Sequence, residues 1–160
     1  MRILAACGLI LLCSTVAPAQ FRLSFDREER SWSIENGLAR AVFQLTAGGT
    51  FEFRSFTCLS SGDVWTPPGG ASSSLIRLQT DNAVFDENTH FKLVRQGSRS
   101  GARRSFRHVI ELEDERALGR FVLELEMYEG QPVLRYRVRF QNIRPQPIRV
   151  TAADMLPWRF

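Results

Sequence analysis

The chain of 160 residues has little from which a metal or redox centre is built, because it contains only three cysteines and two histidines. No group of Cys and His residues has the spacing of a metal site, and no Gly-rich segment has the pattern of a phosphate-binding loop. No potential nucleophile has an evident base. We therefore expect no metal and no cofactor, and composition and spacing alone do not indicate a reaction.

Lysine is almost absent, since Lys92 is the only one among the 21 basic residues. The formal net charge of +4 is a modest excess, and such an excess is weak evidence for nucleic-acid binding. We predict no nucleic-acid partner.

Long apolar runs are also absent beyond the first residues, which have the three parts of an export signal. Arg2 is the charged region, residues 3–16 are the mostly apolar region, and 17–19 read Ala-Pro-Ala, a cleavage site. The run is shorter than the roughly 20 apolar residues of a spanning helix. We predict a signal peptide over 1–19 and a secreted or periplasmic mature chain, 20–160, with no membrane span.

Removal of this signal leaves a single cysteine, Cys58, because Cys7 and Cys13 lie within the signal. No intrachain disulfide is then possible. We expect Cys58 to be a small buried thiol in a strand rather than a reactive nucleophile.

No stretch longer than a turn has a helical apolar period, whereas strand patterns recur along the whole mature chain. The clearest pattern lies in residues 121–140. With a type II′ turn at Gly130-Gln131, apolar residues of both strands share one face, and on the other face Glu126 opposes Arg135 and Glu124 opposes Arg137.

Further strands are predicted between turn dipeptides at Asn36-Gly37 and Gly48-Gly49 and around a Ser-, Gly- and Pro-rich surface loop over 58–74. A basic loop with Gly and Ser is expected over 96–102. A short edge strand or extended lead-in is expected over 21–30. The other expected strands cover residues 31–35, 38–45, 51–56, 75–79, 91–94, 106–112 and 148–155. About nine or ten strands favour an all-β fold, a two-sheet antiparallel β-sandwich in a single domain over 20–160.

Trp65 is the candidate sugar-binding residue, because it lies in the long loop rather than in an apolar strand pattern. Sugars present flat C–H faces that stack on indole rings. The alternative is that Trp65 plugs the open end of the sandwich. Trp32 alternates with Ile34 and is expected in the core.

Two charged segments and the two histidines are weaker candidates. The acidic run from Glu111 to Glu115 contains enough carboxylates for a glycoside hydrolase pair. Strand alternation instead favours a solvated face, paired with arginines, for Glu111 and Glu113, and a turn for Asp114 and Glu115. The basic window between Glu87 and Glu111 is either a landing patch for an acidic polysaccharide or envelope surface, or a hairpin whose arginines pair with the acidic strand. His108 is expected on an inward face, and a catalytic role is not favoured for it or for His90. The basic window contains Lys92, Arg95, Arg99, Arg103, Arg104 and Arg107.

Three segments together resemble the N-terminal β-sandwich of bacterial α-galactosidase-like glycoside hydrolases of the family 36 or melibiase type. They are Trp-Ser-Ile-Glu-Asn-Gly-Leu at 32–38, Arg-Tyr-Arg-Val-Arg-Phe-Gln-Asn at 135–142 and Ala-Ala-Asp-Met-Leu-Pro-Trp at 152–158. The resemblance implies a supersandwich of the galactose-mutarotase type, which packs against a following (β/α)8 barrel that holds two catalytic aspartates. It also implies a galactoside-type carbohydrate ligand.

The chain departs from this family in its length, because it is far shorter than a sandwich followed by a barrel of roughly 250 residues. No catalytic residue is carried over, and only Trp65 is matched to a sugar-site aromatic, by its loop context. The resemblance implies a non-catalytic accessory domain of an exported glycosidase, truncated before its C-terminal catalytic barrel. The alternatives are a free-standing carbohydrate-binding module and an envelope interaction domain without a sugar ligand.

Overall fold

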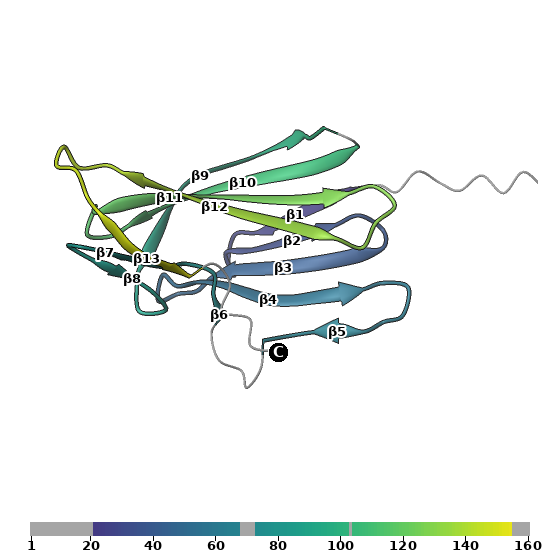
Figure 1. Cartoon of the computed structure of the whole chain (residues 1–160). Coiled ribbons are helices and arrows are strands. Elements are labelled where there is room, and N and C mark those ends of the chain that lie inside the picture. Colours follow the sequence, from purple (N-terminus) through teal and green to yellow (C-terminus); the bar gives the residue numbers. More distant parts are fainter. Residues whose placement is uncertain (1–20, 68–72, 103, 155–160) are drawn as a thin grey trace, which may run out of the picture.

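The computed structural model describes residues 21–67, 73–102 and 104–154, and all its regular secondary structure is strand (Figure 1). The predicted all-β fold is confirmed. Among the described residues no helix is long and apolar enough to cross a membrane. The predicted signal peptide over 1–19 lies outside the described residues, as does Arg103 of the basic window.

In the described part of the chain, thirteen strands form three antiparallel sheets. The largest sheet has the order β1-β2-β3-β4-β5, and β6 also pairs with β4. Its strands are β1 (Arg22–Asp26), β2 (Ser31–Glu35), β3 (Ala39–Leu45), β4 (Phe51–Cys58), β5 (Val64–Trp65) and β6 (Ser73–Ser74).

The second sheet, with the order β12-β11-β10-β9, contains the longest strands of the molecule. They are β9 (Phe91–Ser100), β10 (Ser105–Asp114), β11 (Gly119–Tyr128) and β12 (Leu134–Asn142). The third sheet has the order β13-β7-β8. Its strands are β7 (Arg77–Thr80), β8 (Val84–Phe85) and β13 (Val150–Asp154).

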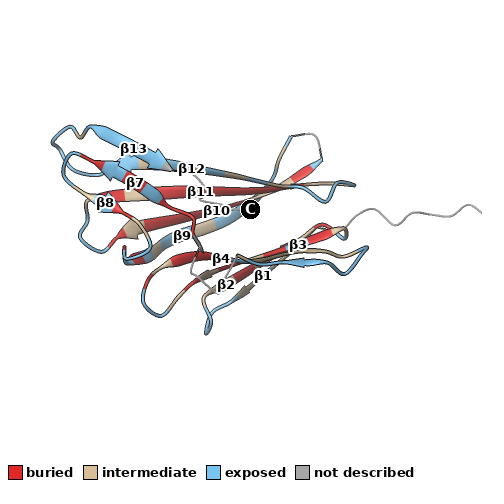
Figure 2. Cartoon of the chain, turned by 60° about the horizontal axis from the view of Figure 1, so that its bottom comes forward, coloured by how far each residue is buried: buried red, intermediate tan, exposed pale blue. Residues whose placement is uncertain are grey.

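The long β9–β12 sheet forms one layer, and the other two sheets cover its inner face side by side (Figure 1). At one end the Phe85 ring of β8 lies 5.1 Å from the Phe121 ring of β11. At the other, the indole N–H of Trp32 in β2 donates a hydrogen bond to the side-chain oxygen of Gln96 in β9. The hydrophobic core lies between these layers (Figure 2). The predicted sandwich is thus confirmed, with a third small sheet added, and Trp32 is a core residue as expected.

The hairpin of β11 and β12 has the predicted register, from Phe121 opposite Phe140 to Met127 opposite Leu134. A slip by one residue would turn the apolar set out of the core. The alternation of apolar and charged residues therefore predicts this pairing correctly.

The turn of this hairpin differs from the prediction, because Glu129 and Gly130 are its central residues rather than Gly130 and Gln131. The Gln131 N–H points to the Tyr128 carbonyl at 3.4 Å, and Gly130 takes a φ of 71°. The predicted two-residue turn would need an N–H donor at Pro132, and proline has none. Glycine at the second central position suits a type II turn, where φ is positive.

The predicted turn after β2 is present, with the Asn36 N–H donating to the Ala39 carbonyl at 3.1 Å and Gly37 at φ 80°. Asn36 itself is fully buried, and its side-chain amide joins two hairpins. Nδ2 donates to the carbonyls of Tyr128 at 2.7 Å and Gln131 at 2.6 Å. Oδ1 accepts the N–H groups of Leu38 and Ala39. All four hydrogen-bonding positions of this amide are used.

The predicted turn after β3 also exists, and Gly49 in it has two reasons to be glycine. Its φ is 83°, and a Cβ there would lie 3.1 Å from backbone atoms of His90 and Phe91. The Phe91 N–H donates to the Gly49 carbonyl at 2.7 Å. This turn therefore anchors the start of β9 against the large sheet.

Two predicted loops are partly strand. Residues 96–100, expected as a basic loop, continue β9 because they pair with β10 as an edge strand. The loop over 58–74 contains β5 and β6, which each add two residues to the edge of β4. In both places, pairing with a long neighbouring strand outweighs the low strand propensity of Gly and Ser.

Candidate functional site

Trp65, the predicted sugar-contact residue, lies in β5 at the edge of the large sheet, opposite Phe56 of β4. As a residue it is 42% exposed, and its neighbour Val64 is 62% exposed. The indole is thus reachable from solvent, although it stands on a short strand rather than in an open loop. Its role in sugar contact stays a prediction.

Cys58 ends β4 and is half-buried, so the expected fully buried thiol is not found. Its Sγ lies 3.2 Å from the Ser60 hydroxyl. Hydrogen bonds with Ser60 and then Ser61 lower the pKa of the thiol to about 7. The last position of the strand, rather than a core position, gives this thiol its partly exposed surroundings.

His108 lies on the inner face of β10 as predicted, 1% exposed, with Nδ1 2.8 Å from the Ser98 hydroxyl. Its Nε2 is buried without a hydrogen-bond partner among the described residues. Burial lowers the pKa of His108 to about 4, so the ring is neutral at pH 7. His90, in contrast, is an exposed residue whose Nδ1 lies 3.9 Å from the Glu115 carboxylate.

Glu111 and Glu113, the first two carboxylates of the acidic run, point outward and are paired with cations. This agrees with the expected solvated face rather than with a glycoside hydrolase pair. Glu111 contacts Arg95 at 2.5 Å, and Glu113 contacts Lys92 and Arg120, both at 2.7 Å. A hydrogen bond from Arg95 lowers the pKa of Glu111, and hydrogen bonds from Arg120 and Lys92 lower that of Glu113. Both groups are therefore held as carboxylates at neutral pH.

Asp114, expected in a turn, is instead the last residue of β10 and is 1% exposed. It accepts hydrogen bonds from Arg116 Nε at 2.9 Å and from the Leu118 N–H at 3.1 Å. These bonds hold the turn in which Ala117 adopts a φ of 55°. Asp114 is a structural cap of this turn.

Four residues of the basic window form ion pairs with glutamates, which confirms the pairing that the second interpretation expects. The pairs are Lys92–Glu113, Arg95–Glu111, Arg104–Glu129 and Arg107–Glu126. Arg104 lies at the hairpin end between β9 and β10, and the other described residues of the window lie on the outer face of the β9–β12 sheet.

This outer face is a grid of four rows that cross the four strands in register. From β9 to β12 the rows are Arg99, Arg107, Glu126, Arg135; Gly97, Val109, Glu124, Arg137; Arg95, Glu111, Val122, Arg139; and Lys92, Glu113, Arg120, Gln141. Six of the eight cations lie on the edge strands, Arg107 and Arg120 lie on the central strands, and all four glutamates stand on the two central strands. The rows contain eight basic residues and four glutamates, so the formal charge of this face is +4.

The glutamates of this grid lie beneath the arginines. Glu124 is 7% exposed as a residue, and it contacts Arg139 at 2.7 Å but Arg107 and Arg137 only at 3.9 Å. On β12, Arg137 stands directly opposite Glu124, and Arg139 stands one row away. The shortest contact of Glu124 is therefore the diagonal one, to Arg139. The side chains that solvent reaches first are guanidinium groups.

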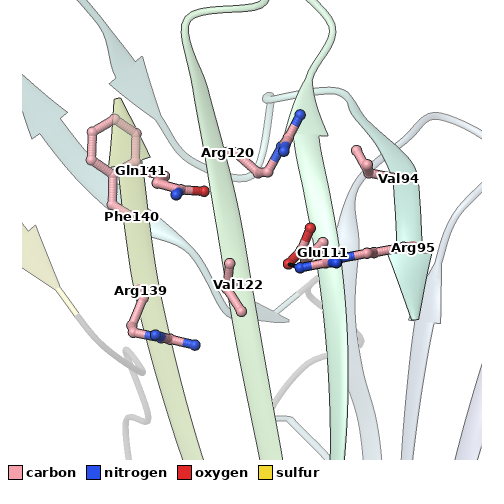
Figure 3. Close-up of a pocket in the computed structure, with 8 residues that line it drawn as sticks. All are labelled: Val94, Arg95, Glu111, Arg120, Val122, Arg139, Phe140 and Gln141. Carbon is pink, nitrogen blue, oxygen red and sulfur yellow. Dashed lines mark hydrogen bonds and ion pairs between the residues drawn. The ribbon is translucent and has the colours of Figure 1, made fainter. Parts of the chain in front are cut away.

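Hollows lie in the middle of this face where short side chains meet. One, of about 560 Å³, is lined by Arg95, Glu111, Arg120, Val122 and Arg139 among others (Figure 3). A second, of about 340 Å³, continues toward β9 and shares four of these residues. We call the two together the sheet trough.

The trough has an apolar floor and a charged rim. Val122 and Val109 line it, and a side chain added at Gly97 would meet no atom within 4 Å of its Cβ. Arg95 stands at the rim with 75% of its side chain exposed, and Arg139 with 61%. The trough was not predicted from the sequence, because three strands contribute its floor. In the described part of the chain, no three His, Cys, Asp or Glu side chains come together as a metal site would require.

No family model matches the chain, and no curated protein matches it. Among solved structures it is similar to the GH36 alpha-galactosidase AgaB from Geobacillus stearothermophilus, with a TM-score of 0.55 and 14% sequence identity. The match covers 76% of this chain and 22% of that chain. The chain therefore shares its fold with part of that enzyme and spans about a fifth of the enzyme's length.

Proposed function

We propose that the chain is the non-catalytic N-terminal sandwich of an exported α-galactosidase-like glycoside hydrolase. The observation that carries this proposal is the fold, shared over 76% of the chain with about a fifth of a GH36 α-galactosidase. In this proposal the sandwich supports a C-terminal catalytic barrel and helps to shape its sugar site. The signal peptide over residues 1–19 directs the protein to the periplasm or the medium.

The contacts of the acidic run support an accessory rather than a catalytic role. A glycoside hydrolase needs one carboxylic acid whose pKa is raised, so that it can protonate the leaving group. The pKa values of Glu111 and Glu113 are lowered by their cationic partners. Neither residue fits the general acid, and the acid is then supplied by the barrel.

Interaction with a separate barrel domain tests this proposal directly. We expect the gene to continue in frame beyond Phe160 into a (β/α)8 domain, and we expect that domain, expressed separately, to bind this chain and gain stability. The thermal midpoint of the barrel with and without the chain is the measurement. An authentic stop codon after Phe160 with no barrel partner encoded nearby contradicts the proposal.

A second candidate function is a free-standing carbohydrate-binding module that uses Trp65, a residue that is 42% exposed at a sheet edge. Stacking of a sugar on this indole would change its fluorescence, whereas Trp32 is fully buried and insensitive. We expect titration with methyl α-galactoside or raffinose to change the emission of the wild type but not of Trp65→Phe. The absence of any response in the wild type would remove this candidate.

A further inference from the structure

We propose that the sheet trough binds a carboxylated saccharide, with the sugar ring on the valine floor and its carboxylate on the rim arginines. The site lies on the outer face of the β9–β12 sheet, whereas Trp65 lies at the edge of the large sheet. The proposal does not rest on the glycosidase assignment, because it concerns a different surface and an anionic ligand.

The trough exists because three short residues are neighbours across three strands. Gly97 of β9 stands opposite Val109 of β10, and Val122 of β11 lies in the next row, opposite Glu111. Every other position in these two rows carries glutamate or arginine, whose long side chains rise around the short ones. The result is a depression with an apolar base in an otherwise charged sheet face (Figure 3).

The accessible charge at the trough is cationic. Arg95, Arg99, Arg120 and Arg139 line it together with a single carboxylate, that of Glu111. Glu111 is 6% exposed and already accepts the Arg95 guanidinium. A guanidinium has five N–H donors, so Arg95, Arg120 and Arg139 keep donors beyond their existing ion pairs. A carboxylate entering the trough therefore meets unused donors and an excess of positive charge.

A saccharide fits this surface better than an extended acidic peptide. Peptides that bind sheets gain main-chain hydrogen bonds by adding to a free edge. The floor of the trough lies largely on β10 and β11, which are paired with strands on both sides. A sugar ring needs no such edge, because its C–H face packs on valine and its carboxylate pairs with arginine in a bidentate manner.

Binding of tetragalacturonate to the 160-residue chain tests the proposal by titration calorimetry at low salt. The matched ligand is the methyl ester, which keeps the rings and hydroxyl groups but carries no charge. We expect the ester to bind at least about tenfold more weakly than the acid. We also expect affinity for the acid to fall as salt is raised, since the rim arginines are exposed.

The variant pair Gly97→Glu and Gly97→Gln separates charge from size. Both side chains enter open space beside Val109, so neither removes an existing ion pair. We expect Gly97→Glu to bind tetragalacturonate at least about tenfold more weakly than Gly97→Gln. Thermal unfolding confirms that both variants are folded before they are compared.

A second matched pair tests the rim. Arg99 makes no ion pair with a described residue and lines the trough, while Arg77 is an exposed arginine on the third sheet. Arg99→Gln should weaken binding about threefold or more, and Arg77→Gln, with the same loss of charge, should leave it unchanged.

Three outcomes would overturn the proposal. Equal affinity for the acid and its ester would show that the arginines do not recognise the carboxylate. Equal affinity of the two Gly97 variants would place binding elsewhere. Equal affinity for a poly-glutamate peptide would make the face a general polyanion surface rather than a saccharide site.

Discussion

The two faces of the β9–β12 sheet are both shielded from water, but by opposite means. On the inner face, side chains such as Ile110, Leu112 and Leu125 are fully buried against the other two sheets. On the outer face, Glu111 and Glu126 are each only 6% exposed, although no sheet of the described residues covers them. Arginines cover these carboxylates instead: Arg95 of the edge strand β9 contacts Glu111, and Arg107 of the central strand β10 contacts Glu126.

This difference shows that burial alone does not identify the source of stability. Apolar burial on the inner face stabilises in proportion to the area removed from water. A carboxylate covered by arginines loses hydration, and its ion pairs return roughly what was lost. We therefore expect substitutions on the inner face to cost much more than substitutions on the outer face at the same depth.

The largest effect is expected for Phe121→Ala on the inner face. Phe121 is 1% exposed, and its ring contacts those of Phe85, Phe91 and Phe140. The substitution should lower the free energy of unfolding by about 3–5 kcal/mol, through lost apolar contact and the cavity that remains. Urea unfolding measures this value. Val133→Ala, at a 46% exposed position, is the control, and a similar loss in both variants would contradict the comparison.

The next effect is the pH dependence caused by His108, the buried imidazole of the inner face. Its pKa is about 4 in the folded protein and about 6.5 as a model value. The unfolded chain therefore binds more protons between these values, and stability falls as pH decreases from 6.5 to 4. The loss can reach about 3 kcal/mol. Stability above pH 6.5 and below pH 4 should not change further on account of this group.

The variant His108→Leu should flatten the stability curve between pH 6.5 and 4, measured by urea unfolding at several pH values. The outer-face carboxylates titrate in a lower window: the pKa values of Glu111 and Glu113 are lowered by arginine and lysine. Their contribution is present above the model value of 4.5 and is lost as pH falls below it. An unchanged slope in His108→Leu would mean that the buried imidazole is not the sensor.

The sequence predicts the inner and outer faces of single hairpins well, because alternation along one or two strands is a local signal. Residues 121–140 show both patterns at once, and their register is as predicted. The position of the hairpin turn was predicted wrongly, because a turn centred on Gly130-Gln131 needs an N–H donor at Pro132 and proline has none. Asn36 was expected only as a turn residue, and its bonds to a second hairpin depend on tertiary contacts that no local pattern reveals.

The sheet trough could not be predicted, because its floor depends on the register of three strands. Residues 96–100 were expected in a loop, which would have removed Gly97 from the sheet. The pairing of β9 with β10 shifts its register between Glu111 and Leu112 of β10, and this shift sets which residues of β9 face outward. Such bulges re-aim side chains without a strong signature in a single sequence.

On the outer face, Glu124→Gln should have a moderate effect. Glu124 contacts three arginines, and its removal leaves their charges close together. Loss of one partner of a buried pair costs about 3–5 kcal/mol, whereas exposed pairs are worth about 0–1 kcal/mol. Because the arginines are partly exposed, we expect a loss of about 1–2 kcal/mol, smaller at high salt, in urea unfolding. Glu115→Gln, on an exposed carboxylate, is the control, and a loss as large as that of Phe121→Ala would erase the difference between the faces.

The smallest effects distinguish the diagonal from the direct contact of Glu124. Arg137 stands directly opposite, yet its guanidinium lies 3.9 Å from the carboxylate, while Arg139, one row away, lies at 2.7 Å. Double-mutant cycles of each arginine with Glu124, using Gln at every site, isolate the two pairwise energies. We expect about 0.5–1 kcal/mol for Arg139 and near zero for Arg137. A larger coupling for Arg137 would mean that cross-strand register, rather than the reach of the side chain over the sheet, decides how this face covers its carboxylates.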